Sequence, residues 1–200
     1  MLRNYPKKLT LNDGRTVIIR PLKEEDELAL RDFYAALSAE DRRYLKHDVT
    51  NPRTVHQWTH HIDYDFVIPI VAETPNAIVS AATLHRDPHG WSPHVGEIRL
   101  VLHKDFRGSG LGLGMAKEIF SIATFLRLEK VVAEMVEDQT AAIKIFEKMG
   151  FEREALLRNH VIDHERQQRN LVIMTAYLSW LWEKITDVVM DSVSDHSGRY

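Results

Sequence analysis

The sequence of 200 residues contains no cysteine. This absence excludes a disulfide scaffold, a thiolate metal site and a cysteine nucleophile. Hydrophobic residues make up 44% of the chain and charged residues 28%, which is ordinary for a globular protein. The composition therefore also excludes collagen-like, low-complexity and wholly disordered chains.

Long apolar runs and an excess of basic charge are missing as well. The longest apolar stretches, such as residues 66–72, are far too short to span a bilayer. Residues 1–8 lack the apolar segment of a signal peptide. The 26 basic and 29 acidic residues give a net charge of −3, which does not favour nucleic-acid binding. We therefore expect a cytoplasmic protein with neither a membrane nor a nucleic acid as its partner.

Hydrophobic patterns and turn residues predict a mixed α/β (α+β) fold. Strands are expected over residues 16–21, 65–73, 77–86, 95–102, 130–136, 152–157 and 167–177. Helices are expected over residues 24–37, from 38 onward, and over 54–61, 110–126 and 140–149. Hairpin-like strands followed by a strand–helix–strand–helix passage indicate one sheet flanked by helices.

The chain shows no internal repeat and no linker, so we expect a single domain over residues 1–177. Residues 178–200 are expected to form a C-terminal helix with a polar tail, because apolar residues recur there at helical spacing. The favoured interpretation is a helix packed on its own domain. The alternative is a homodimer contact, since Trp180 and Trp182 are costly to leave in water.

The most informative segment is a glycine-rich turn between the expected strand 95–102 and helix 110–126. Glycine lets the backbone approach a ligand closely, and the free N–H groups of a first helical turn bind phosphates. A Rossmann fingerprint fails at Leu113, and a P-loop fails because Gly114 is followed by Met115. The alternative is a flexible loop that merely begins a helix, which four glycines within residues 108–114 disfavour.

The sequence pattern Arg107-x-x-Gly110-x-Gly112 resembles the acetyl-CoA signature of the GNAT N-acetyltransferase superfamily, (Gln/Arg)-x-x-Gly-x-(Gly/Ala). Residues 16–26 are similar to the first strand of that family and the start of its first helix. Residues 138–151 are similar to its second motif, so the resemblance covers roughly residues 9–177. Residues 11–45 also look like the GNAT domain of bacterial protein-lysine acetyltransferases, although no acyl-CoA synthetase-like region accompanies them here.

The resemblance implies a mostly antiparallel sheet with splayed central strands and acetyl-CoA as co-substrate. Main-chain groups of Leu100, Val101 and Leu102 would pair with the pantetheine arm. The Val101 N–H would also stabilise the oxyanion that forms on the thioester carbonyl. The pyrophosphate would be held by the amides of the loop residues Arg107, Gly108, Ser109, Gly110, Leu111 and Gly112.

Glu97 occupies the position of the general base in histone-type and protein-lysine members of the family. Such a base is needed because a lysine-like amine, with a pKa of about 10.4, is almost fully protonated at pH 7. To be effective in this task, a glutamate at this position needs its pKa raised by partial burial. The alternative is a surface ion pair with Arg99, which shares a strand face with Glu97.

The second motif departs from the family pattern at two positions. Gln139 replaces the usual asparagine, and Phe146 replaces the tyrosine that protonates the departing thiolate in many relatives. We therefore assign no general acid. Gln139, Ala142 and Phe146 are expected to line the CoA site, with helix-core packing as an equal account of Ala142 and Phe146.

The 11 histidines show no metal-ligand spacing, so we expect no metal. A substrate-side role stays open for His89, His94 or His160. The polar segment 159–169 is a candidate lining for a small-molecule pocket.

The sequence thus predicts an acetyl-CoA-dependent N-acetyltransferase that acts on a primary amine by direct attack, with Glu97 as base. A protein lysine is the first acceptor hypothesis, and a small amine or amino acid is the second. A protein acceptor predicts an open groove flanked by the helices of residues 24–61, whereas a small acceptor predicts a closed pocket. A non-catalytic acyl-CoA-binding regulatory module is a third hypothesis, which Phe146 keeps open.

Overall fold

A computed structural model describes residues 2–163 and 165–179. Its centre is one eight-stranded sheet in the order β1-β2-β3-β4-β5-β6-β8-β7. Neighbouring strands pair antiparallel, except β5 and β6, which run parallel. This sheet confirms the predicted fold class. The strands are β1 Lys7–Thr10, β2 Thr16–Pro21, β3 Val67–Glu73, β4 Ile78–Arg86, β5 Val95–Leu102, β6 Lys130–Val136, β7 Glu152–Ile162 and β8 Gln168–Tyr177.

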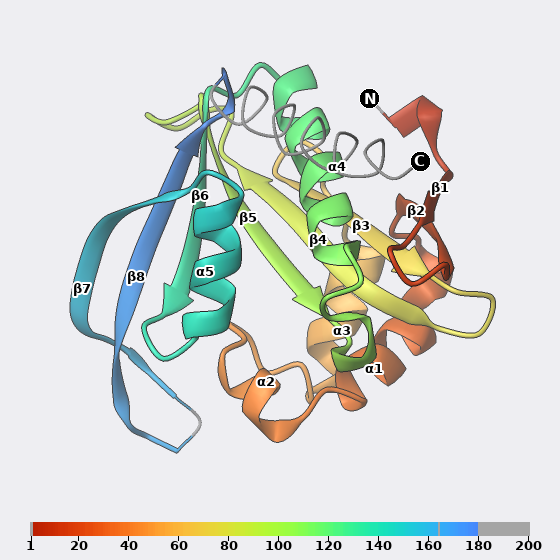
Figure 1. Cartoon of the computed structure of the whole chain (residues 1–200), viewed down its shortest axis with the longest axis horizontal. Helices are drawn as coiled ribbons and strands as arrows, with labels where there is room; N and C mark the ends of the chain where they lie inside the picture. Colours follow the sequence, from red (N-terminus) through yellow and green to blue (C-terminus); the bar gives the residue numbers. More distant parts are fainter. Residues whose placement is uncertain (1, 164, 180–200) are drawn as a thin grey trace, which may run out of the picture.

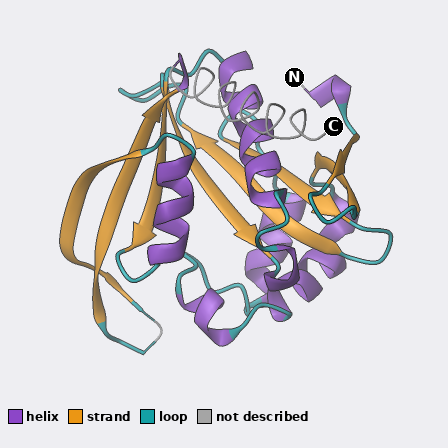
Figure 2. Cartoon of the chain, in the orientation of Figure 1, coloured by secondary structure: helices purple, strands orange, loops and turns teal. Residues whose placement is uncertain are grey.

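Helices cover both faces of the sheet (Figures 1 and 2). On one face, α4 (Leu111–Phe125) and α5 (Thr140–Lys148) enclose the larger hydrophobic core. On the other face, α1 (Glu27–Ala35) and α3 (Pro52–His60) enclose a smaller core. The short α2 (Ala39–Arg43) begins at Ser38, whose Oγ accepts the Asp41 N–H. The described residues also contain three 3₁₀ turns: η1 Leu2–Asn4, η2 Glu24–Asp26 and η3 Lys104–Phe106.

The structure differs from the predicted elements in two places. The helix predicted over residues 24–37 is divided into η2 and α1. In α1, Leu28 is 71% exposed, and the buried residues are Leu30, Phe33 and Tyr34. The strand predicted to end at residue 157 continues as β7 to Ile162, through a register irregularity between Leu157 and Val161.

Residues 178 and 179 follow β8 directly. The Leu178 side chain is buried, and its N–H donates to the Glu129 carbonyl at 2.9 Å. The remainder of the predicted C-terminal helix, including Trp180 and Trp182 of the hypothetical dimer contact, lies outside the described residues. None of the helices within the described ranges has the length and apolar character needed to cross a membrane.

Candidate active site

The two parallel strands at the centre of the sheet pair only at their beginnings. Residues 95–97 of β5 lie opposite residues 130–132 of β6, and beyond Glu97 the two strands diverge (Figure 1). The outer part of β5 keeps its pairing with β4 up to Leu102. Its other edge has no strand partner among the described residues. We call this opening between β5 and β6 the fork.

The register decides which main-chain groups face the fork. The His94 carbonyl accepts from Lys130 on β6, whereas the His103 N–H donates to the Val79 carbonyl on the β4 side. Because N–H groups alternate along a strand, Leu100 and Leu102 direct theirs to the fork. Val101, opposite Ala81, directs its N–H to β4. The register therefore gives no support to the oxyanion role predicted for the Val101 N–H.

The glycine loop connects β5 and η3 to α4. Gly108 and Gly110 have φ of +73° and +86°, a conformation that favours glycine. The β1–β2 turn holds the loop in place, because the Asn12 N–H donates to the Ser109 carbonyl at 2.9 Å. The α4 ladder includes the bond from the Gly114 N–H to the Gly110 carbonyl, so the amides of Leu111 and Gly112 precede it. With no acidic residue in this first turn, the loop fits an anionic phosphate group.

Two further contacts shape the loop. A Cβ on Gly112 would lie 3.1 Å from Leu102 Cδ1, so α4 begins close to the end of β5. Arg107 donates to Asp41 Oδ1 of α2 at 2.6 Å. Burial opposes ionisation of Asp41, but its bonds to Ser38 and Arg107 lower its pKa. The Arg107 side chain thus ties the loop to α2.

The second motif lies at the end of β6 and on α5. Gln139 Oε1 accepts the Val136 N–H at 2.8 Å and so closes the turn that follows β6. The buried Phe146 ring packs edge-on against Phe151, with ring centroids 5.0 Å apart. Ala142 packs against the same core. Packing within the fold accounts for these contacts, and the predicted roles of the three residues in CoA binding stay predictions.

Charged side chains gather over the fork on the face away from α4. Glu97 accepts from Arg99 Nε at 2.9 Å and from Lys46 Nζ at 2.5 Å. The same Lys46 Nζ donates to Glu134 Oε2 of β6 at 2.6 Å. Burial opposes ionisation of Glu97, yet the two cations outweigh it and lower its pKa to about 2. The raised pKa that an effective base needs is therefore absent, because the ion pair with Arg99 forms and Lys46 adds a second cation.

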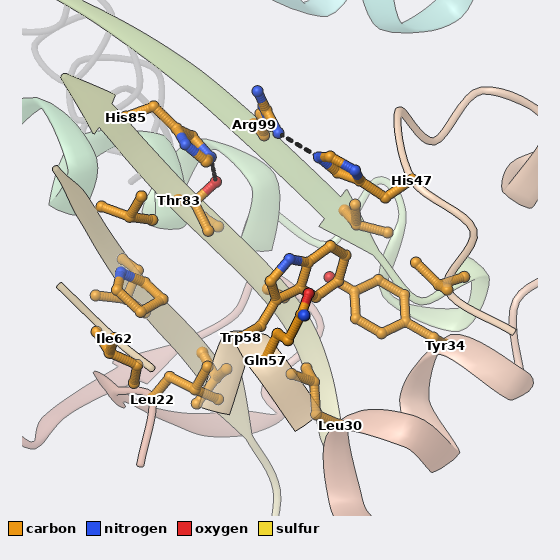
Figure 3. A pocket seen from close by; sticks show the side chains of 18 of the residues that line it. Leu22, Leu30, Tyr34, His47, Gln57, Trp58, Ile62, Thr83, His85 and Arg99 are labelled. Atoms are coloured by element: carbon orange, nitrogen blue, oxygen red, sulfur yellow. Dashed lines mark hydrogen bonds between the residues drawn. The ribbon is translucent and has the colours of Figure 1, made fainter. Parts of the chain in front are cut away.

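A cavity of about 260 Å³ adjoins this charged cluster (Figure 3). Its wall is mostly apolar and comes from α1, α3, the segment before α3 and strands β3–β5. The residues that shape it include Leu22, Leu30, Tyr34, Trp58, Ile62, Ala81 and Val101. Lys46 and Arg99 of the charged cluster also line it. The cavity therefore opens toward the groups that surround Glu97.

Two neutral imidazoles border the cavity. His85 bonds to Thr83 Oγ1 at 2.9 Å, and burial lowers the pKa of His85 to about 4. Burial, with Arg99 and Lys46 nearby, also lowers the pKa of His47. The histidines singled out from the sequence lie elsewhere: His89, His94 and His160 are exposed and do not line the cavity. The described residues of the polar segment 159–169 do not line it either.

Comparison with known proteins identifies the family. A family model described as acetyltransferase (GNAT) domain matches residues 16–152. The chain belongs to the GNAT acetyltransferase family. The GNAT domain of S. lividans PAT superposes with a TM-score of 0.74 at 18% identity, and the match covers 88% of this chain and 98% of that one.

Two other solved GNAT structures show the same fold. A ribosomal-protein-alanine N-acetyltransferase from Brucella melitensis has a TM-score of 0.68 at 21% identity, covering 80% of this chain and 98% of its own. The structure of yncA from Salmonella typhimurium, solved with acetyl-CoA, has a TM-score of 0.67 at 17% identity. The match covers 81% of this chain and 94% of yncA. At these identities the likeness establishes the GNAT fold and leaves the acceptor open.

Sequence reasoning found Arg99 as a partner of Glu97 but missed Lys46 and Glu134 in this GNAT chain. Lys46 lies 51 positions before Glu97 and is in a segment with no motif of its own. Glu134 was placed on a predicted strand, but only the observed pairing shows that it faces Lys46. A cluster of Glu27, His56 and His60 was also missed. The His56 Nδ1 and Glu27 Oε2 atoms are 3.0 Å apart, so this cluster joins α1 to α3.

Proposed function

We propose that this chain transfers the acetyl group of acetyl-CoA to a primary amine at the fork, by direct attack of the amine on the thioester. The observation that carries the proposal is the fork itself. The free edge of β5 leads into the glycine loop, and the carboxylates of Glu97 and Glu134 lie over the opening. One short stretch of chain thus offers main-chain donors to one substrate and negative charge to the other.

The CoA side of the site is built from main-chain groups. Leu100 and Leu102 present N–H groups along the open edge, where an amide-containing pantetheine arm pairs as an added strand would. The amides of Leu111 and Gly112 and the positive end of α4 hold the pyrophosphate. The Leu100 N–H, directed to the fork, is also the donor that we assign to the thioester oxygen.

The amine side is built from side chains. Glu97 and Glu134 bind the acceptor as an ammonium group, and Glu97 accepts its proton. A carboxylate with a pKa of about 2 is a weak base, so this step requires Lys46 to leave Glu97 when the acceptor arrives. No general acid is assigned, because Phe146 carries no hydroxyl and a thiolate, with a thiol pKa of about 8.5, leaves without one.

The cavity points to the chemistry of the acceptor. Its wall is largely apolar and adjoins the carboxylates, so it fits a small amine with an aromatic or branched apolar body. The cavity is partly open, so its apolar wall, and not enclosure, is what favours a small acceptor over a protein lysine. The names of the solved relatives include a ribosomal-protein-alanine and a spermidine N-acetyltransferase, so the fold alone serves several kinds of amine.

A panel of amines tests this proposal. Release of free CoA is followed with 2-phenylethylamine, spermidine and a lysine peptide as acceptors. We expect the highest kcat/KM for 2-phenylethylamine. The Ala81→Val variant narrows the cavity and should raise the KM for that amine about tenfold, with the KM for acetyl-CoA unchanged. A higher kcat/KM for the lysine peptide, unaffected by Ala81→Val, would contradict the small-acceptor assignment.

A further inference from the structure

Lys46 brings a primary amine of the protein itself to the fork. Its Nζ lies 2.5 Å from Glu97 Oε1 of β5 and 2.6 Å from Glu134 Oε2 of β6. These carboxylates belong to the two strands that separate just beyond Glu97. The Nζ therefore bridges the fork on the face from which an acceptor would approach.

Contacts on both sides of Lys46 hold the segment that carries it in place. Lys46 follows α2, and two ion pairs tie α2 to the body of the molecule. Asp41 binds Arg107 of the glycine loop, and Arg43 binds Glu165 of the β7–β8 turn. The next residue, His47, contacts Arg99 on β5 and packs edge-on against Trp58 of α3. The segment that carries Lys46 is thus held on both sides.

We propose that Lys46 is a self-acetylation site of this protein. The inference rests on the proposed function, because it requires acetyl-CoA to be bound along β5. The Lys46 ammonium gives one proton to Glu97, and the neutral Nζ attacks the thioester carbonyl carbon. A C–N amide bond forms and the C–S bond breaks. The thiolate leaves with the bonding electron pair and takes up the second proton that the nitrogen releases.

Acetylation would change the charge at the fork. The Nζ would become a neutral amide nitrogen, which can no longer form an ion pair with either glutamate. Glu97 would keep Arg99 as its cation, and Glu134 would lose the cation that the structure assigns to it. Both carboxylates would then be more available to an external ammonium group. Self-acetylation is therefore expected to activate the enzyme toward its acceptor.

The chain offers a matched control in Lys7. Its Nζ lies 2.7 Å from Glu118 Oε2, and its side chain is 37% exposed, against 33% for Lys46. Lys7 and Glu118 lie on β1 and α4, away from the β5–β6 opening. The two lysines have similar exposure, and each forms an ion pair with a glutamate, one for Lys7 and two for Lys46. They differ in their place relative to the fork.

The experiment incubates the full chain with acetyl-CoA and follows each lysine by peptide mass spectrometry. We expect Lys46 to gain an acetyl group at least about tenfold faster than Lys7, because a held amine reacts as an intramolecular group. The rate should be independent of protein concentration, and Glu97→Gln should slow it. In the Lys46→Arg variant the fast acetylation should disappear from the intact mass.

Parallel assays separate the two ways of failing. Acetylation of Lys46 no faster than that of Lys7, with 2-phenylethylamine still acetylated, would overturn this inference alone. A rate that rises with protein concentration would overturn it as well. If acetyl-CoA raises the melting temperature but neither Lys46 nor any external amine is acetylated, the proposed function fails together with the inference.

Discussion

Glu97 combines two chemical demands in one side chain. As a partner of Arg99 and Lys46 it must be ionised, and the two cations keep its pKa near 2. As a general base it must take a proton from an amine, which a strongly stabilised carboxylate does poorly. The conflict is resolved if the contact with Lys46 belongs to the resting state and is lost during turnover. In the proposed mechanism, Glu97 is an ion-pair partner at rest and a base when the acceptor is bound.

The ion pairs of Glu97 should make the stability of the protein depend on pH. The pKa of Glu97 is lowered from 4.5 to about 2 in the folded chain, so its contribution is complete above pH 4.5. That contribution is lost as the pH falls through the folded value. We expect Glu97→Gln to lower the melting temperature at pH 7, with a difference from the wild type that shrinks toward pH 2. A constant difference across this range would contradict the assignment.

The two glycines with positive φ in the loop give a second prediction. Alanine at either position meets the strain of left-handed backbone, about 1–2 kcal/mol. At Gly108 nothing lies within 4 Å of the added Cβ, whereas at Gly110 the Cβ would lie 3.1 Å from the Asn12 side chain. We expect Gly110→Ala to destabilise the fold more than Gly108→Ala in denaturant unfolding. Equal effects would show that Asn12 gives way without cost.

At the scale of elements, β5 and the loop after it were well predicted from the sequence. The predicted strand 95–102 has the same bounds as β5, and the spacing of Arg107, Gly110 and Gly112 identified the helix start that follows. Of the groups around Glu97, Arg99 was predictable from its place on the same strand face, but Lys46 was not. Lys46 reaches it through ion pairs formed by the neighbouring α2, and no periodicity in the sequence records such a contact. The direction of the Val101 N–H likewise depends on the pairing with β4, which becomes known only from the structure.

The packing of α5 leads to a third prediction. Phe146 is buried against Phe151, while its neighbour Ile145 is 50% exposed. Phe146→Ala should cost about 3–5 kcal/mol of unfolding free energy, as for other buried phenylalanines. Ile145→Ala is the control on the same helix and should change stability by about 0.5 kcal/mol or less. Similar losses for both variants in urea unfolding would show that Phe146 is not a core residue.

At the scale of the whole molecule, the glycine loop's helix and the cavity lie on opposite faces of the sheet. The helix that begins at the glycine loop covers one face, and the cavity with its charged rim lies on the other (Figures 1 and 3). In the proposed function, acetyl-CoA and the amine meet at the fork, where the sheet is open between its two faces. The groups proposed for the acceptor side are scattered in sequence, from Leu22 of the cavity wall to Glu134 on β6, whereas those proposed for the CoA side lie within residues 100–112. This scatter explains why the loop was found from its motif and the cavity was not.

Binding of acetyl-CoA should stabilise the whole domain. A ligand present at 100 times its dissociation constant adds about 2.7 kcal/mol to the unfolding free energy. We expect acetyl-CoA to raise the melting temperature, and Gly112→Val to reduce this rise, because a side chain there would crowd Leu102 and the loop amides. Thermal unfolding with and without the ligand measures both effects. If acetyl-CoA raised the melting temperature of Gly112→Val as much as that of the wild type, the loop would not be part of the CoA site.

The measurement that tests the central claim most directly is the initial rate of CoA release from acetyl-CoA, with and without a primary amine. The account predicts release that depends on the amine, that is strongly reduced in Glu97→Gln, and that yields one acetylated amine for each CoA. Acetyl-CoA that stabilises the protein but releases no CoA with 2-phenylethylamine, spermidine or a lysine peptide would contradict acetyl transfer at the fork.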